Sequence, residues 1–159
     1  MSSDSLAPTV NRRELLLAGA AGVIAFAMPF RAHARPALDE AIRSFTGGVA
    51  LREGRVKFEI SPLVENGNAV PVSVTVESPM TAGDHVRRIA LFNEKNPQAD
   101  IAVFHLGPRA GRAHVATRIR LAASQTVVAL AEMSDGSFWI SKANVIVTLA
   151  ACIEDISRA

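Results

Sequence analysis

The sequence predicts an all-β protein, an Ig-like β-sandwich of about seven strands with a short N-terminal helix and a C-terminal arm. Apolar and polar residues alternate along several segments, most clearly in residues 70–76, where every second residue is valine. Turn-forming residues interrupt these segments at fairly regular intervals, and one early segment alone has helical spacing. Short two-faced strands separated by turns are typical of two packed antiparallel sheets.

Residues 1–34 are expected to be an export signal, removed from the mature protein. Arg12 and Arg13 precede an uncharged apolar stretch of about 16 residues, Leu15 to Phe30, which is short for a membrane span. Ala32-His33-Ala34 then forms a small-x-small cleavage site. Paired arginines before a mildly hydrophobic stretch favour the twin-arginine route and hence the periplasm. A Sec signal or an uncleaved anchor is the alternative interpretation.

The composition of the remaining chain is that of a nearly neutral globular domain. After residue 34 the sequence holds 14 Lys and Arg against 13 Asp and Glu. Hydrophobic residues make up 49% of the whole sequence, enough for one ordinary core in residues 35–149. Aromatic residues are scarce, Tyr is absent and no basic stripe is present, so a nucleic-acid-binding surface is not expected.

Residues 37–46 are the expected helix, because Leu38, Ile42 and Phe45 recur at helical spacing and Gly47-Gly48 follow as a stop signal. After this segment the period changes to two. Turns are expected at residues 65–68, 78–79, 96–97, 107–108 and 134–136. Strands are expected at residues 56–60, 70–76, 86–92, 101–106, 115–121, 126–133 and 138–149, the last with a potential break near 143–144.

Cys152 is the only cysteine in the sequence. Exported proteins usually hold cysteines in pairs because their compartment favours disulfides, and a lone cysteine cannot form an internal bridge. Cys152 follows the last predicted strand by a few residues, a position more typical of an edge or tail than of a core. This position favours a reactive thiol, while an inert buried cysteine and an intermolecular disulfide remain open.

A metal or cofactor is not expected. A blue-copper site needs two histidines and a cysteine with a weak axial ligand. His85, His105 and His114 are present, but no histidine or methionine follows Cys152. The three histidines are more simply isolated polar residues on strands or loops.

No catalytic residues are expected either. Asp84-His85 are adjacent, and adjacent side chains of a strand point apart. No serine lies in a nucleophile elbow, and no glycine-rich phosphate loop is present. Arg87-Arg88, Arg118 and Arg120 suggest an anion-attracting face, for which a solvated or partner-facing sheet surface is the simpler interpretation.

Several short blocks resemble the SoxY family of sulfur-oxidation carrier proteins, in the same order and over roughly residues 38–152. The resemblance implies an Ig-like sandwich without catalytic machinery of its own, paired with a second sandwich protein of the SoxZ type. It also implies that a cysteine on a C-terminal arm, matched here by Cys152, carries sulfur intermediates such as those of thiosulfate oxidation between partner enzymes. The blocks are Phe45–Gly48, Glu65–Val72, Ser78–Thr81, Arg118–Ala122 and Ser124–Gln125.

The arm, residues 150–159, differs from the glycine-rich arm of that family. Ala150, Ala151, Ile153 and Glu154 flank Cys152, which resembles the SoxY-related branch with an Ala-Ala-Cys-Ile-Glu arm. Alanine favours helix where glycine favours backbone freedom, so we expect a stiffer arm that serves fewer partners. Acidic residues beside the thiol disfavour the thiolate, so an activating cation is expected from a partner.

Two further hypotheses stay open beside the sulfur carrier. The chain could be an exported binding or structural sandwich that pairs with a SoxZ-like protein and does not carry cargo. An enzyme or a metal protein is the third class, and it has the least support in the residues.

Overall fold

The structure is a computed structural model that describes residues 37–149. The chain divides into two units, Met1–Ala34 and Arg35–Ala159, and the described residues all belong to the second. The predicted signal peptide and the arm from residue 150 lie outside the described residues. Within residues 37–149, the helices are too short or too polar to span a membrane.

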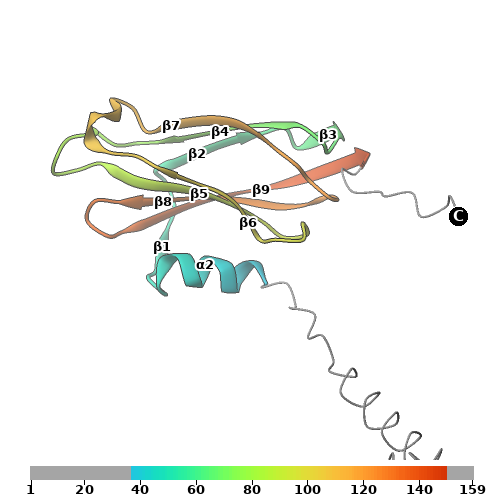
Figure 1. The fold of residues 1–159 in the computed structure, drawn as a ribbon, viewed down its shortest axis with the longest axis horizontal. Coiled ribbons are helices and arrows are strands. Elements are labelled where there is room, and N and C mark those ends of the chain that lie inside the picture. The colour runs from blue at the N-terminus through green and yellow to red at the C-terminus, as the bar shows by residue number, and fades with distance from the viewer. Residues whose placement is uncertain (1–36, 150–159) are drawn as a thin grey trace, which may run out of the picture. The chain divides into compact units, whose positions relative to one another are not determined.

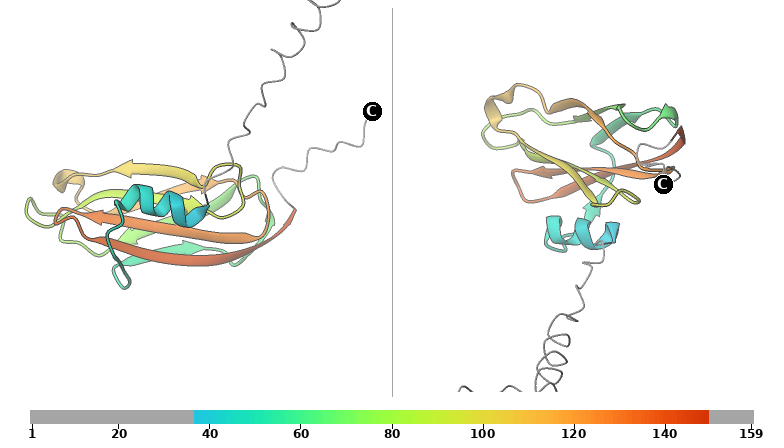
Figure 2. Two further views of the ribbon diagram at one scale, coloured as in Figure 1. Left: turned by 90° about the horizontal axis from the view of Figure 1, so that it is seen from below. Right: turned by 45° about the vertical axis from the view of Figure 1, so that its right-hand side comes forward.

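The described residues form two packed sheets with one helix against the outer face of the larger sheet (Figures 1 and 2). The larger sheet has the order β1-β9-β8-β5-β6, with β3 also paired to β9, and the smaller sheet has the order β2-β4-β7. This arrangement confirms the predicted all-β sandwich with a short N-terminal helix. The elements are α2 (Leu38–Thr46), β1 (Leu51–Arg52), β2 (Val56–Ile60), β3 (Leu63–Asn66), β4 (Val70–Val76), β5 (Val86–Asn93), β6 (Asp100–His105), the 3-10 turn η1 (Pro108–Ala110), β7 (His114–Ile119), β8 (Gln125–Met133) and β9 (Phe138–Leu149).

The main core lies between the two sheets. In β4 the four alternating valines are buried in this core, and the intervening residues face outward, as the period of two requires. The interior strand β5, between β8 and β6, is buried on both faces over most of its length. Ile89 and Leu91 belong to the core between the sheets, whereas Ala90 and Phe92 pack in a second cluster beneath α2.

Helix α2 covers that second cluster with its apolar side. Ile42 is buried, and the Phe45 ring packs edge-on against Phe92 at 5.6 Å and Phe138 at 6.0 Å between ring centroids. The helix ends where Gly47 takes a left-handed φ of 63° and Gly48 donates a hydrogen bond to the Arg43 carbonyl. The glycine stop signal therefore fixes where the chain leaves the helix.

Two strands, β1 and β3, were not predicted from the sequence, so the described residues hold nine strands rather than about seven. Both β1 and β3 are short and pair in parallel with β9, and neither is long enough to show an alternating pattern. Glu65 and Asn66, predicted as a turn, belong to β3. The suspected break in β9 is absent, because its ladder with β8 runs through Ala143 and Asn144.

Candidate functional site

The predicted site residues Ala150, Ala151, Cys152, Ile153 and Glu154 lie outside the described residues. The described residue that directly precedes them is Leu149, the last residue of β9. Cys152 is three residues beyond Leu149, the last residue of β9, and three residues span at most about 11 Å. The arm therefore starts from the end of the sandwich around Leu149.

Strand β3 holds the end of β9 in place. Leu63 pairs with Ile146 and Asn66 pairs with Leu149, whereas the β8 ladder stops at Val145. Beyond these pairs, the Gly67 amide donates a 2.8 Å hydrogen bond to the Leu149 carbonyl. The point from which the arm starts is thus fixed by the segment after β2.

The loop of residues 120–124 joins this anchor from the smaller sheet. The buried Leu121 donates its backbone N–H to the Gly67 carbonyl at 2.9 Å. The Ser124 hydroxyl accepts a 2.9 Å hydrogen bond from the Val147 amide. The loop therefore contacts both the turn after β3 and β9 itself, and we call this assembly of residues 63–67, 120–125 and 146–149 the root platform.

Asn96, in the loop between β5 and β6, is hydrogen-bonded to the root platform. Its Oδ1 accepts hydrogen bonds from the Ala122 amide and from Gln125 Nε2, both at 2.9 Å. Its Nδ2 donates to the Arg120 carbonyl at 2.7 Å. Gln125 is buried, and its Oε1 accepts from the Lys95 amide at 2.7 Å. One amide side chain therefore satisfies three polar groups of the root platform.

Replacing Asn96 with alanine is expected to lower the free energy of unfolding by about 1–3 kcal/mol, because partly buried polar groups lose their partner. Denaturant unfolding of the purified protein measures this change. Asn144→Ala is the matched control, since the exposed Asn144 Oδ1 accepts one hydrogen bond from Thr126. Equal destabilisation by the two substitutions would show that Asn96 has no special role in the platform.

Apolar side chains lie open at the root platform. Leu63, Ile146 and Leu149 are 57%, 59% and 55% exposed. Leu63 and Ile146 are register partners in a parallel pair, so their side chains share the outer face of the sheet. We call Leu63 and Ile146 the root patch; Leu149 has the opposite parity on β9 and lies outside it. A hollow of about 270 Å³ beside it is lined by Glu94, Ser124, Gln125, Thr126, Asn144, Val145 and Ile146.

The four arginines do not form one anion-attracting face, so that hypothesis is wrong. Arg88 pairs with His105 and Glu132 in the larger sheet. Arg118 lies opposite Pro71 in the smaller sheet, near the other end of the sandwich. Arg120 follows β7, and its carbonyl belongs to the root platform.

The three histidines are not grouped with enough ligands for a metal ion: among residues 37–149, no cluster of three or more His, Cys, Asp or Glu side chains has that arrangement. His114 Nδ1 lies 2.9 Å from Thr75 Oγ1 on the outer face of the smaller sheet. His85 and His105 line a common hollow with Arg87 and Arg88.

A larger hollow of about 1040 Å³ runs over the outer face of β2, β4 and β7. Glu59 on its wall is hydrogen-bonded by Ser73 at 2.8 Å and ion-paired with Lys57 at 2.7 Å. The hydrogen bonds from Lys57 and Ser73 lower the pKa of the Glu59 carboxyl. Because these polar groups already satisfy one another, the hollow has the character of a solvated sheet face.

The family model described as sulfur oxidation protein SoxY matches residues 42–152, which is most of the chain and includes the cysteine. The protein belongs to the SoxY family. The structure of the sulfur carrier protein SoxY from Chlorobium limicola f thiosulfatophilum is similar to it, with 27% identity and a TM-score of 0.59 over 70% of this chain and 96% of that chain. No curated protein sequence matches this chain significantly.

Superoxide reductases share the fold of this SoxY family member. The enzyme from Ignicoccus hospitalis, a neelaredoxin, is 18% identical with a TM-score of 0.54, over 58% of this chain and 79% of that chain. The enzyme from Nanoarchaeum equitans is 12% identical with a TM-score of 0.51, over 61% of this chain and 99% of that chain. At these identities the likeness concerns the architecture of the sandwich alone.

The SoxY-like sequence blocks fall at the two ends of the sandwich. The blocks at 65–72, 118–122 and 124–125 meet in or beside the root platform. The blocks at 45–48 and 78–81 lie at the opposite end, near Arg88 and His85. Sequence reasoning missed Asn96 as a site residue, although the Asn-Pro dipeptide marked its loop.

Proposed function

We propose that this SoxY-family protein is a periplasmic sulfur carrier, not an enzyme, that holds a sulfur intermediate covalently on Cys152 for partner enzymes. The observation that carries the proposal is the extent of the family match, which runs through the sandwich and ends at residue 152, the only cysteine. The root platform supports it, because it fixes Leu149, the residue after which the arm begins.

The chemistry needs little more than the thiol. A thiolate attacks an electrophilic sulfur atom, a sulfur–sulfur bond forms and the former substituent of that sulfur leaves. With no second cysteine in the chain, the adduct cannot be resolved into an internal disulfide, so cargo stays bound until a partner removes it. A carrier of this kind requires no catalytic base of its own.

The root patch gives partner enzymes a contact surface next to the cargo. Cys152 stays within about 11 Å of Leu149 along the chain, so an enzyme that binds the thiol approaches the end of the sandwich that carries Leu63 and Ile146. Both side chains are more than half exposed and apolar. Burial of apolar surface favours association, and we assign this surface to the enzymes that load and unload the arm.

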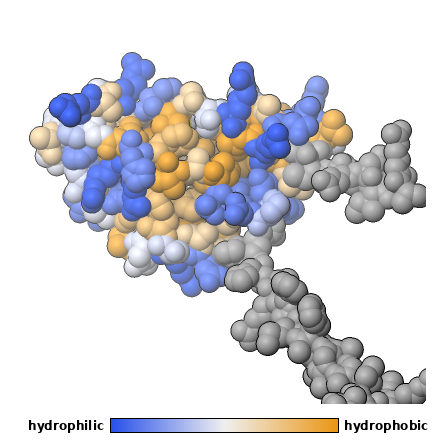
Figure 3. Space-filling model, viewed as in Figure 1, coloured by the Kyte–Doolittle hydropathy of each residue, from blue (hydrophilic) through white to orange (hydrophobic). Residues whose placement is uncertain are grey.

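We propose a SoxZ-like sandwich as the stable partner. Support comes from the side of the sandwich where the edge strands β6 and β7 face each other, where apolar surface gathers (Figure 3). Phe104, Leu106 and Val115, on or beside these strands, are only partly buried against the core. Edge strands offer unpaired backbone groups to a second protein. The predicted twin-arginine signal supports export to the periplasm.

Intact-mass spectrometry of protein from the periplasm tests the carrier function. Cells supplied with reduced sulfur compounds should yield protein with additional sulfur on Cys152, removable by a thiol reductant. Starved cells provide the control. Free thiol alone under every sulfur-supplying condition would contradict the proposal and favour a binding or structural sandwich that pairs with the SoxZ-like protein.

A further inference from the structure

A β-bulge aims two adjacent arginines at one carboxylate, at the end of the sandwich away from the arm. The register between β5 and β8 shifts between Val86 and Arg88, which leaves Arg87 as the extra residue. Adjacent residues of a regular strand point to opposite faces, whereas a bulge redirects them. Arg87 Nη1 lies 3.3 Å from one oxygen of Glu132, and Arg88 Nε donates a hydrogen bond to the other.

The cluster holds an excess of positive charge. Two guanidinium groups share the single carboxylate of Glu132, whose side chain is 9% exposed. Arg88 is fixed further by the Phe45 ring, 4.4 Å below its guanidinium carbon. Arg87 is 58% exposed, so most of its N–H donors remain accessible to a ligand.

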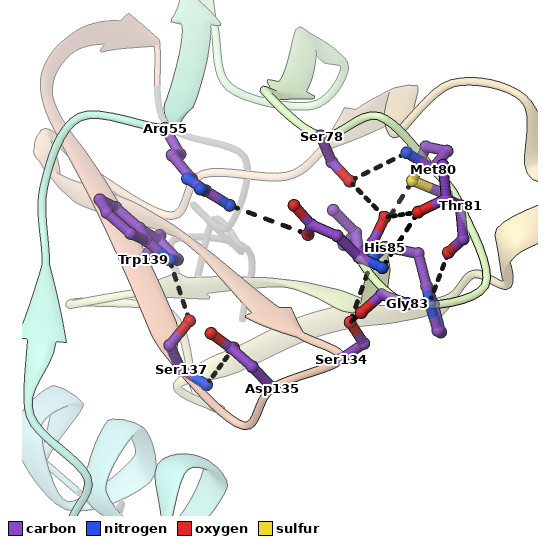
Figure 4. A network of polar contacts seen from close by, with 12 residues as sticks. Arg55, Ser78, Met80, Thr81, Gly83, His85, Ser134, Asp135, Ser137 and Trp139 are labelled. Carbon is purple, nitrogen blue, oxygen red and sulfur yellow. Dashed lines mark hydrogen bonds and ion pairs between the residues drawn. The ribbon is translucent and has the colours of Figure 1, made fainter.

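Two histidines complete a hollow of about 510 Å³ around these arginines. His105 is the register partner of Arg88 on β6 and is exposed. His85 Nδ1 lies 3.1 Å from the Thr81 carbonyl, so this nitrogen donates and Nε2 is left for another partner (Figure 4). The neighbouring Asp84 is directed to Arg55 instead, at 3.9 Å.

The loop that positions His85 is firmly built. The Ser134 hydroxyl accepts the His85 amide and donates to the Gly83 carbonyl, each at 3.1 Å. Met80, which is buried, takes a left-handed φ of 51°, and its sulfur lies 3.5 Å from the Val86 amide. Such backbone strain in a non-glycine residue is concentrated at functional sites and ligand clamps.

The hollow cannot receive cargo from the arm of the same molecule. Glu132 pairs with Phe138 at the start of β9. Strand β9 is 12 residues long, so its ends are about 36 Å apart. Three residues beyond Leu149 cover at most about 11 Å, so cargo on Cys152 of the same molecule does not reach the hollow.

We propose that the hollow lined by His85, Arg87, Arg88, His105 and Glu132 binds a small anion with several oxygens, such as sulfate or thiosulfate. Guanidinium groups bind oxyanions through paired N–H donors. The two histidines approach from other elements, so an anion with oxygens in several directions suits the site better than a halide. This binding site goes beyond the carrier function and does not depend on Cys152.

Titration of the mature protein from the periplasm with sodium sulfate or sodium thiosulfate, followed by NMR, tests the proposal. Saturable shifts are expected in the side-chain signals of Arg87, Arg88 and His105, with a dissociation constant on the order of 1 mM. Arg87→Gln should weaken binding at least about tenfold, which corresponds to roughly 1.4 kcal/mol. Lys142→Gln removes an exposed positive charge outside the hollow and should leave binding unchanged.

Three results would overturn the proposal. The first is that sodium chloride at matched ionic strength produces the same shifts. The second is that the Arg87→Gln protein binds sulfate as tightly as the unaltered protein. The third is that a tetraglutamate peptide binds the same residues more tightly than either sulfur anion, which would indicate an acidic protein partner. Thermal unfolding checks that Arg87→Gln is folded, and His105→Gln, at an exposed position, should weaken sulfate binding independently.

Discussion

Replacing Cys152 with serine should abolish sulfur-dependent turnover by cells that rely on this protein, because the hydroxyl cannot form the sulfur–sulfur bond of the adduct. The loss should be as complete as deletion of the whole chain, since no second cysteine is present to take over. The rate of sulfur-compound oxidation by the complemented deletion strain measures it. No sulfur adduct should appear on the variant.

The body of the protein should tolerate this substitution. A cargo-bearing thiol must be reachable by partner enzymes, so the carrier proposal predicts a change in the free energy of unfolding of no more than about 0.5 kcal/mol. Ser157→Ala, in the same arm, is the matched control and should retain turnover. Normal turnover by the Cys152→Ser strain would rule out the carrier function and leave a binding or structural role for the sandwich.

Replacing Leu91 with alanine should destabilise the fold by about 2–5 kcal/mol, the usual cost of a cavity at a fully buried leucine. Leu91 is 0% exposed and lies in the interior strand β5, within the core between the two sheets. Domains of this size are stable by only about 5–15 kcal/mol, so much of the total would be lost. Chemical denaturation at constant protein concentration measures the change.

Val103→Ala is the control for this prediction. Val103 lies on the neighbouring strand β6 but is 41% exposed, so its truncation should cost less than about 1 kcal/mol. A Leu91→Ala protein as stable as the Val103→Ala protein would mean that the two sheets do not pack as the structure describes.

The sandwich was predictable where burial on one face imposes a period of two. The valines of residues 70–76 and the helical spacing of Leu38, Ile42 and Phe45 each identify an element that the structure confirms. The parallel strands β1 and β3 could not be found in this way. Each is defined by backbone pairing with β9 and has two to four residues, so no side-chain pattern marks it.

The candidate site was likewise predictable from the sequence only in part. A single cysteine that follows the last predicted strand favours a thiol function from the sequence alone. The root platform depends instead on hydrogen bonds between distant segments, such as Gly67 to Leu149 and Asn96 to the loop of residues 120–125. The bulge at Arg87 could not be predicted from the sequence either, because an extra residue in a β-ladder can be recognised only when its partner strand is known.

The pairing of β9 has a mechanical consequence. Strand β9 is held along one edge by β8 and along the other by β1 and β3. A pull on Leu149 along the strand axis is borne first by the pairs with β3, which cover Ile146 to Leu149, and then by the β8 ladder, which ends at Val145. Hydrogen bonds loaded along the strand resist in shear and do not open one after another, so the end of β9 resists being drawn out of the sandwich.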